Sequence, residues 1–322
     1  MLDLRLYITA LAQHKPLDGG GHNGSSPAMT SKRHMDGFGA AALVGFFLLL
    51  AVNQVVIKLT NDGFQPVFAA GVRSFGAIFV LGLWMILRGV SFDFRKGTRA
   101  SGLLAGVIFA FEFICLFVAL DLTTVTRVSI IFYSMPVWMA VVAHFTLPGE
   151  QLTRLKTVGL ALAFSGVVWA ILDRSSAGGQ ASIWGDLAAL GAALGWMAVS
   201  LTARLTPLRE LSAEMQMFWQ VLVSAPILMV SAMFFGPFIR DVQPMHYWGL
   251  AFQIVLIASG AFLFWFWLLK QYKASSVASF AFLSPIFGVA MGWMWLGETL
   301  NAATIGALVL VAIGIVLINR RS

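Results

Sequence analysis

Charged side chains are scarce in this sequence. Aspartate, glutamate, lysine and arginine together make up 11% of its 322 residues, against roughly 25% in an ordinary soluble domain. Hydrophobic residues account for 59%. A chain with so little charge cannot cover itself with a hydrated surface, so a soluble globular protein is excluded and lipid is the expected solvent.

The residues that build catalytic centres are also few. Cys115 is the single cysteine and lies in an apolar run, so neither a disulfide framework nor a cysteine metal site is expected. Histidine occurs at five scattered positions, 14, 22, 34, 144 and 246, without metal-binding spacing. No GxxxxGKS phosphate loop is present, so ATP is not expected to drive this protein directly. The sequence therefore predicts no metal, no cofactor and no enzyme.

What the chain has in abundance is apolar runs. Ten runs of about 20 residues are separated by short polar loops, and about 20 helical residues cross a hydrocarbon layer of roughly 30 Å. Barrel strands would be about 10 residues long and would alternate. We therefore predict ten transmembrane helices, at residues 38–58, 66–87, 100–120, 127–146, 154–172, 184–204, 212–235, 246–269, 275–296 and 301–318.

The predicted orientation follows from the basic residues. Of 21 lysines and arginines, 16 fall in the N-terminal tail, at the C-terminus or in loops on the tail's side of the membrane. Cytoplasmic loops carry an excess of lysine and arginine, so both termini are predicted in the cytoplasm. The protein is predicted to lie in the inner (plasma) membrane. The same placement explains the net charge of +7 without a nucleic-acid partner.

The chain also contains an internal repeat. An offset of 149 aligns the proline of "FYSMPVW" with that of "AFLSPIF", and an offset of 148 aligns Glu150 with Glu298 and Gly166 with Gly314. Five spans is an odd number, so the second copy must be inverted in the bilayer, as in many secondary transporters. We predict a disordered cytoplasmic tail at 1–36, repeats at 37–175 and 184–322, and a linker at 176–183.

The motifs "AVNQVVIKL", "AAGVRSF", "SMP" with "LPGEQLT", and "LSP" with "LGETLN" resemble the drug/metabolite transporter superfamily over about residues 38–318. Within it the chain resembles the ten-span EamA-type exporters, and among these the aromatic amino acid exporters. The resemblance implies a metabolite exporter of the inner membrane. Small multidrug exporters of the superfamily use a glutamate in the first span, where this chain has Asn53 and Gln54. Spans nine and ten contain no lysine or arginine from Ala274 to Asn319 to meet a phosphate, so a phosphorylated substrate is not expected.

Two ionisable residues lie deep in predicted spans. Arg73 and Glu112 are both roughly 11 to 12 Å from the outer ends of their helices. Charges at this depth are costly and mark either an internal pair or a transport pathway. Two interpretations stay open: a buried Arg73–Glu112 pair, or a substrate carboxylate bound by Arg73. Lys58, near a span end, is expected to reach the interface.

Other polar side chains are predicted to line a substrate cavity near the membrane midplane. Asn53 and Gln54 in the first span share their depth with Ser129 and Tyr133 in the fourth, at about 8 to 9 Å from the outer surface. A further set joins aromatic rings to hydrogen-bonding groups, which suits a substrate with an apolar side chain and a polar head. Its members are Trp196, Ser200, Gln253, Phe264, Phe282 and Ser284.

Two prolines occupy equivalent positions in spans four and nine, Pro136 and Pro285. Proline removes a backbone donor and frees a carbonyl that can face a cavity. The prolines either kink their helices for packing or act as hinges.

The sequence thus predicts an all-α integral membrane protein of two inverted five-helix repeats. The expected function is export of a small amphipathic metabolite, most of all an amino acid with an aromatic or apolar side chain, by alternating access and as a monomer. An intramembrane enzyme acting on lipid and a passive channel are the alternatives. Three glycine pairs with GxxxG spacing, Gly102/Gly106, Gly191/Gly195 and Gly288/Gly292, predict close helix contact, either inside the bundle, which is the favoured interpretation, or between protomers.

Overall fold

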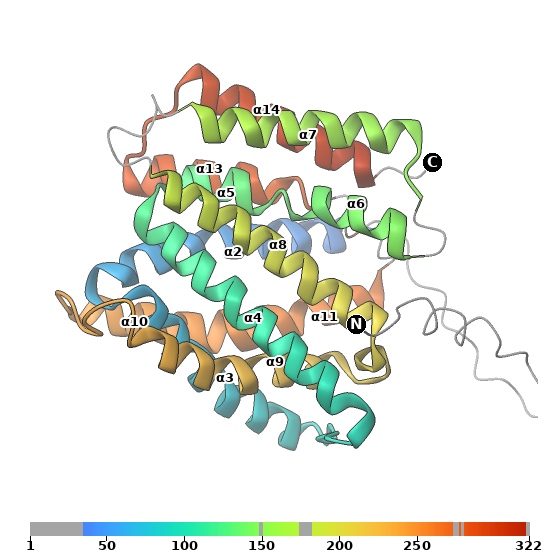
Figure 1. The fold of residues 1–322 in the computed structure, drawn as a ribbon, viewed down its shortest axis with the longest axis vertical. Helices are drawn as coiled ribbons and strands as arrows, with labels where there is room; N and C mark the ends of the chain where they lie inside the picture. Colours follow the sequence, from blue (N-terminus) through green and yellow to red (C-terminus); the bar gives the residue numbers. More distant parts are fainter. Residues whose placement is uncertain (1–34, 148–150, 174–181, 273–276, 278–279, 320–322) are drawn as a thin grey trace, which may run out of the picture. The chain divides into compact units, whose positions relative to one another are not determined.

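The computed structural model describes residues 35–147, 151–173, 182–272, 277 and 280–319 (Figure 1). The regular elements in this part of the chain are helices, and several begin at a side chain that accepts a hydrogen bond from the first turn. Asp36 caps α2 (Gly37–Gly63) in this way, and Gln65 caps α3 (Pro66–Leu87). These caps satisfy donors that have no partner within the helix.

The other helices follow in chain order. They are α4 (Lys96–Leu122), α5 (Val125–Phe132), α6 (Met135–Thr146), α7 (Arg154–Leu172), α8 (Ile183–Leu205), the 3-10 helix η2 (Pro207–Glu210), α9 (Ala213–Ala232), α10 (Pro244–Phe252), the π-helix η3 (Gln253–Ala261), α11 (Phe262–Gln271), α13 (Leu283–Leu296) and α14 (Ala302–Asn319). Helices α5 and α6 form one interrupted span, and α10, η3 and α11 form another.

The predicted spans are confirmed. In the described part of the chain nine helical stretches are long and apolar enough to cross a membrane, and α13 is a tenth, shorter apolar helix. The ninth span was predicted from residue 275, whereas the described helix begins at Leu283. Residues 273–276 and 278–279, most of the tail predicted at 1–36 and most of the linker predicted at 176–183 lie outside the described residues.

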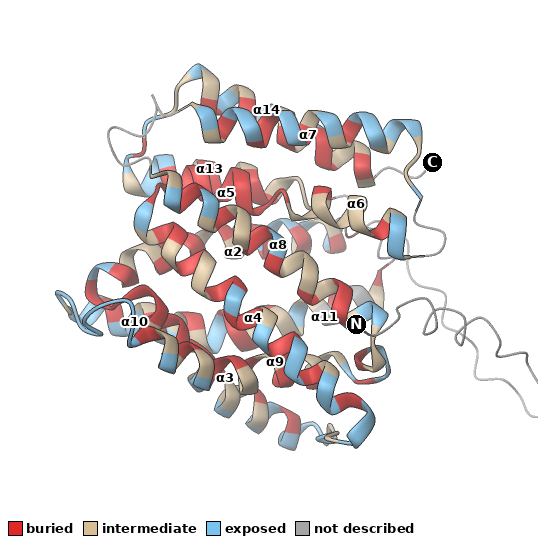
Figure 2. Cartoon of the chain, viewed as in Figure 1, coloured by how far each residue is buried: buried red, intermediate tan, exposed pale blue. Residues whose placement is uncertain are grey.

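The outward faces of the helices are apolar, as a lipid solvent requires. Large side chains such as Phe79 (63% exposed) and Phe111 (52% exposed) stand on them. Figure 2 shows buried residues concentrated where helices meet and exposed ones on the opposite faces. A soluble monomer rarely exposes such contiguous apolar surface, so the bundle is built to contact hydrocarbon.

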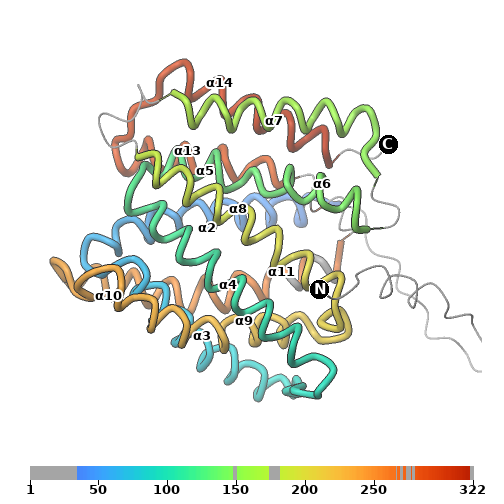
Figure 3. The backbone as a smooth tube through the Cα atoms, in the orientation of Figure 1, coloured from blue at the N-terminus to red at the C-terminus, as the bar shows by residue number. Residues whose placement is uncertain are grey.

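The two halves pack with two-fold symmetry. Helix α7 lies against α14, α3 against α9 and α5 against α13, so each of these spans contacts its counterpart in the other repeat (Figure 3). The remaining large contacts come in equivalent sets. Helix α4 packs on α8 as α10 and η3 pack on α2, and α4 packs on α9 as η3 packs on α3.

Glycines show the same symmetry at atomic detail. A Cβ on Gly159 would lie 2.8 Å from the carbonyl oxygen of Gly314, and one on Gly166 would lie 2.8 Å from that of Ala307. The repeat offset of 148 carries Gly159 onto Ala307 and Gly166 onto Gly314. The two close approaches are therefore one contact, repeated by the two-fold.

The bundle has two ends. We call the end with Gly37 and Asn319 the terminal face, and the end where α2 finishes and α14 begins the distal face. Helix α8 begins at the distal face, because Gly185 in its first turn lies against Thr123 at the end of α4. The first span therefore starts at the terminal face and the sixth at the distal face, so the repeats are inverted.

Candidate functional site

At the distal face, charged side chains are used to hold helix ends. Lys58 donates hydrogen bonds from Nζ to the carbonyl oxygens of Leu120 (3.0 Å) and Thr123 (2.8 Å) at the end of α4. These carbonyls have no partner within their own helix, and a cation is favoured beside them. Lys58 was expected to reach the interface; the structure instead gives it an internal role.

Glu298, in the link between α13 and α14, performs the complementary task. Its carboxylate accepts hydrogen bonds from the backbone N–H groups of Val125 (2.7 Å) and Thr126 (2.8 Å) in the first turn of α5. An anion at a helix N-terminus satisfies free donors and complements the helix dipole. The contact joins the second half to the first. Its repeat counterpart, Glu150, lies outside the described residues.

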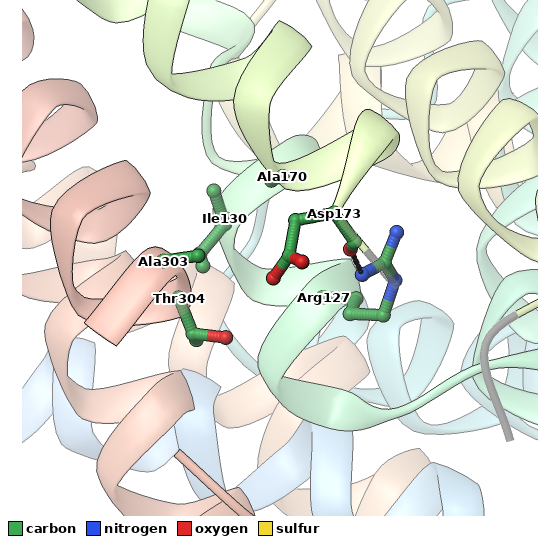
Figure 4. Close-up of a pocket in the computed structure, with 6 residues that line it drawn as sticks. All are labelled: Arg127, Ile130, Ala170, Asp173, Ala303 and Thr304. Atoms are coloured by element: carbon green, nitrogen blue, oxygen red, sulfur yellow. Dashed lines mark hydrogen bonds between the residues drawn. The ribbon is translucent and has the colours of Figure 1, made fainter. Parts of the chain in front are cut away.

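Arg127 forms a buried ion pair beside this cap. Its guanidinium binds both carboxylate oxygens of Asp186 on α8, at 3.0 and 2.7 Å, and the two side chains are only 4% and 0% exposed. The same guanidinium donates to the carbonyl oxygen of Asp173 (Figure 4). The adjoining cavity holds about 10 Å³, the lower limit for one water, so it is no substrate site.

The links between helices close the distal face further. Arg240 binds Asp121 at 2.6 and 3.0 Å, and the backbone of Gln65 donates to the carbonyl oxygen of Phe238 (2.9 Å). The pKa of the Arg240 guanidinium is raised because Asp121 accepts its hydrogen bonds. These contacts connect the two halves at the distal face.

Deeper in the bundle the structure brings together two of the predicted cavity residues. Ser129 on α5 donates a hydrogen bond to Oε1 of Gln54 on α2, and Gly288 on α13 leaves the room for it. A Cβ at Gly288 would lie 2.0 Å from the Ser129 hydroxyl. Nε2 of Gln54 and Oδ1 of the adjacent Asn53 are buried without a hydrogen-bond partner.

Gln253 comes from the other half. It is fully buried, donates from Nε2 to the Thr60 hydroxyl (3.2 Å) and leaves its Oε1 without a partner. It begins the π-helix η3, a feature that the residue pattern does not predict and that is frequent at functional sites.

The π-helix changes the angular spacing between two predicted cavity residues, Gln253 and Phe264, because a π-helix turns less per residue than an α-helix. In the structure Phe264 is 37% exposed and stacks on Trp267, which is itself 37% exposed. A ring at this surface does not line an enclosed cavity.

Aromatic rings meet between α5 and α8, where two of the predicted cavity residues, Trp196 and Tyr133, lie. The ring of Trp196 stacks on Phe132 with centroids 5.1 Å apart and meets Tyr133 edge to face at 6.4 Å. Tyr133 is buried. The Ser200 hydroxyl donates to the carbonyl oxygen of Trp196 within α8 and is partly exposed.

Both predicted hinge prolines begin a helical segment. Pro136 is the second residue of α6, just after the interruption at Tyr133 and Ser134, and Pro285 is the third residue of α13, after a turn that ends at Phe282. A proline ring clashes with the backbone carbonyl four residues earlier, so a regular helix cannot continue through that turn. Each interruption therefore lies just before its proline. Ser284, beside Pro285, is buried.

Arg73 and Glu112 do not form the ion pair that the sequence left open. Arg73 is 3% exposed and lies over the ring of Phe113, 4.5 Å from its centroid. Among the described residues no carboxylate oxygen lies within 4.0 Å of its nitrogens. Glu112 is 5% exposed, and its Oε2 has no hydrogen-bond partner. The two side chains interact electrostatically without touching.

A larger groove, of about 240 Å³, lies between α2 and α10. Its rim includes Met245 and Trp248, which are 49% and 76% exposed. Such apolar, exposed walls face the surrounding lipid, so this groove is not an enclosed polar site.

Known proteins share this architecture. A solved crystal structure superposes with a TM-score of 0.61 at 19% identity, over 87% of this chain and 97% of that one, which supports the fold. The Bacillus subtilis uncharacterized transporter YoaV is 22% identical over 85% of this chain and 94% of its own. The Escherichia coli K12 uncharacterized inner membrane transporter YedA is 23% identical over 86% of this chain and 89% of its own.

A third relative, the Bacillus subtilis uncharacterized transporter YvbV, is 31% identical over 60% of this chain and 63% of its own. The sequence model of the EamA-like transporter family matches residues 37–172 and again residues 183–320, once in each half of the bundle. This multi-pass membrane protein belongs to the EamA-like transporter family.

Proposed function

We propose that the protein is a secondary transporter that exports small amphipathic metabolites, above all amino acids with aromatic or apolar side chains, by alternating access. The proposal rests on buried polar atoms that no protein group satisfies. Among the described residues, five such atoms lie on spans that carry predicted cavity residues or pack against them: Oδ1 of Asn53, Nε2 of Gln54 and Oε2 of Glu112 in the first half, and Nε1 of Trp219 and Oε1 of Gln253 in the second. The others are Oδ1 of Asn61 and the hydroxyls of Thr123 and Thr126, near the distal face. Each such atom costs about 1 to 3 kcal/mol. A polar substrate that satisfies them recovers this cost.

The aromatic rings supply the other half of the chemistry. Phe132, Tyr133 and Trp196 form one cluster, and Phe109, Phe113 and Phe117 form a ladder along α4. Rings beside unsatisfied polar atoms suit a ligand with an apolar side chain and a polar head.

The contacts between the halves at the distal face support the proposed mechanism. With both termini in the cytoplasm, as the basic residues indicate, the distal face is external. Export then requires the contacts of Arg127, Arg240 and Glu298 between the halves to break, with movement at the interruptions before Pro136 and Pro285. The protein carries this out as a monomer, without ATP.

A flux assay tests this function. Purified protein in lipid vesicles is expected to take up radiolabelled phenylalanine with saturation, faster when the vesicles are preloaded with unlabelled phenylalanine. O-phosphoserine should not compete with phenylalanine for uptake, since spans nine and ten contain no lysine or arginine that could bind a phosphate. Protein-free vesicles are the control. No saturable uptake of any amino acid would refute the substrate class, and uptake indifferent to preloading would favour a passive channel.

The alternative enzyme has its own readout. Mass spectrometry of the lipids in the same vesicles, before and after incubation, is expected to show no protein-dependent product. A new lipid product would favour the intramembrane enzyme.

A further inference from the structure

Arg73 is a buried cation that lacks an anion. The residue is 3% exposed and lies roughly 11 Å along α3 from the distal face. The partners that the structure gives it are the rings of Phe113, at 4.5 Å, and Phe117, at 6.0 Å. A cation–π contact offsets only part of the cost of burying a guanidinium. The site is therefore incomplete without an anion.

Glu112 is a buried carboxylate with an oxygen that lacks a hydrogen-bond donor. It is 5% exposed, its Oε2 has no hydrogen-bond donor, and α8 closes on its backbone. A Cβ on Gly195 would lie 2.9 Å from the Cβ of Glu112, so this wall has no space for a donor side chain.

Local geometry explains why the two charges do not pair directly. Glu112 and Phe113 are consecutive in α4, so their side chains point roughly 100° apart around the helix. Arg73 occupies the side of Phe113, and Glu112 is turned towards α8. The chain thus holds a cation and a carboxylate apart on neighbouring helices, both shielded from water.

We propose that Arg73 and Glu112 together bind a zwitterion, with Arg73 receiving the carboxylate and Glu112 the ammonium group of the same small molecule. The inference rests on the amino acid export proposed above and names the residues that recognise the two charges. A planar guanidinium binds carboxylate with two parallel hydrogen bonds, and an ammonium group supplies donors to the unpartnered Oε2. The ladder of Phe109, Phe113 and Phe117, whose successive centroids lie 4.2 and 5.8 Å apart, borders the cation with an apolar surface.

Competition with split substrates tests the assignment. Vesicles that take up labelled phenylalanine are challenged with phenethylamine, which lacks the carboxylate, and 3-phenylpropionate, which lacks the ammonium group. The native protein is expected to prefer phenylalanine by roughly ten- to hundredfold over either, the worth of one charge-assisted contact. Arg73→Gln should lose only the preference for phenylalanine over phenethylamine. Glu112→Gln should lose only the preference for phenylalanine over 3-phenylpropionate. Arg73→Lys keeps the charge and should restore part of the first preference.

Arg95→Gln and Glu210→Gln are the matched controls. They remove an exposed pair at the terminal face, with side chains 52% and 54% exposed, and should leave both preferences unchanged. Melting temperature in detergent shows whether each variant is folded. If native protein transports amino acids and both site variants retain the native order of competitors, the zwitterion site is wrong and the export function stands. If native protein transports no amino acid, the proposed function fails and the site falls with it.

Discussion

Single charged residues in this bundle act on helix ends. Lys58 binds the final carbonyls of α4, and Glu298 binds the first N–H groups of α5. Both use groups that a helix leaves unsatisfied, so one side chain secures the end of a whole element. Each therefore carries more stability than an exposed ion pair, which contributes about 0 to 1 kcal/mol.

Glu298→Ala tests this at the residue scale. The substitution leaves the buried N–H groups of Val125 and Thr126 without an acceptor, so the free energy of unfolding should fall by about 2 kcal/mol. Glu298→Gln should cost less, because its amide oxygen still accepts. Denaturant titration in detergent measures both, with Glu210→Gln as the exposed control. Equal stability of Glu298→Ala and the control would contradict the capping role.

Whole helices meet in this fold through small residues. Helix α7 contacts α14 where Gly159 and Gly166 face Gly314 and Ala307. Without a hydrophobic force between helices in lipid, close backbone approach and packing drive association. The prediction of internal GxxxG packing is confirmed for Gly191 and Gly195, which contact Cys115 and Glu112 of α4.

Gly314→Ala tests the contact between α7 and α14. Its Cβ would lie 2.5 Å from both the Gly159 carbonyl oxygen and the Ala163 Cβ, so the helices must separate, at about 1 to 3 kcal/mol. Gly45→Ala, in α2 with nothing within 4 Å, should be neutral or stabilise by up to about 1 kcal/mol. Thermal melting in detergent compares the two. Identical melting temperatures would show that the helix pair tolerates the extra methyl group.

The ion pair of Arg127 and Asp186 joins two further elements, α5 and α8. Arg127→Leu should lower the free energy of unfolding by about 3 to 5 kcal/mol, because Asp186 is left buried without a partner. Arg127→Leu combined with Asp186→Leu should recover most of this loss, since two apolar side chains replace the pair. A double-mutant cycle with coupling near zero would contradict a direct interaction.

At the scale of the whole molecule, the halves are inverted and joined at the distal face. Arg240 with Asp121, Gln65 with Phe238 and Glu298 with α5 all cross from one half to the other there. The orientation of the chain decides which side of the membrane this face meets.

Cysteine labelling tests the orientation. In a Cys115→Ala background, Ile239→Cys at the distal face (Ile239 is 62% exposed) should react with a membrane-impermeant maleimide on intact cells. Phe92→Cys, between α3 and α4 at the terminal face, should react only after permeabilisation. The reason is the excess of lysine and arginine on the terminal side. The reverse labelling pattern would place both termini outside.

Composition and spacing were enough to predict the ten spans and the inverted duplication. They also placed Gln54 and Ser129 at the same depth in the bundle. A span is a local property, since about 20 apolar residues insert as a helix whatever they contact. The repeat survives as an offset between similar segments, and depth in a helix follows from counting residues.

Which side chains contact one another was decided only by the tertiary structure. The contacts of Lys58, Arg127 and Glu298 join residues 59 to 173 positions apart, and no local pattern encodes such a distance. Arg73 packs on the ring of Phe113 whereas Glu112 faces α8, and residues Gln253–Ala261 form a π-helix, which changes how far each residue turns. Periodicity says which residues share a helix face only while the helix stays regular, whereas the neighbouring helices decide what that face meets.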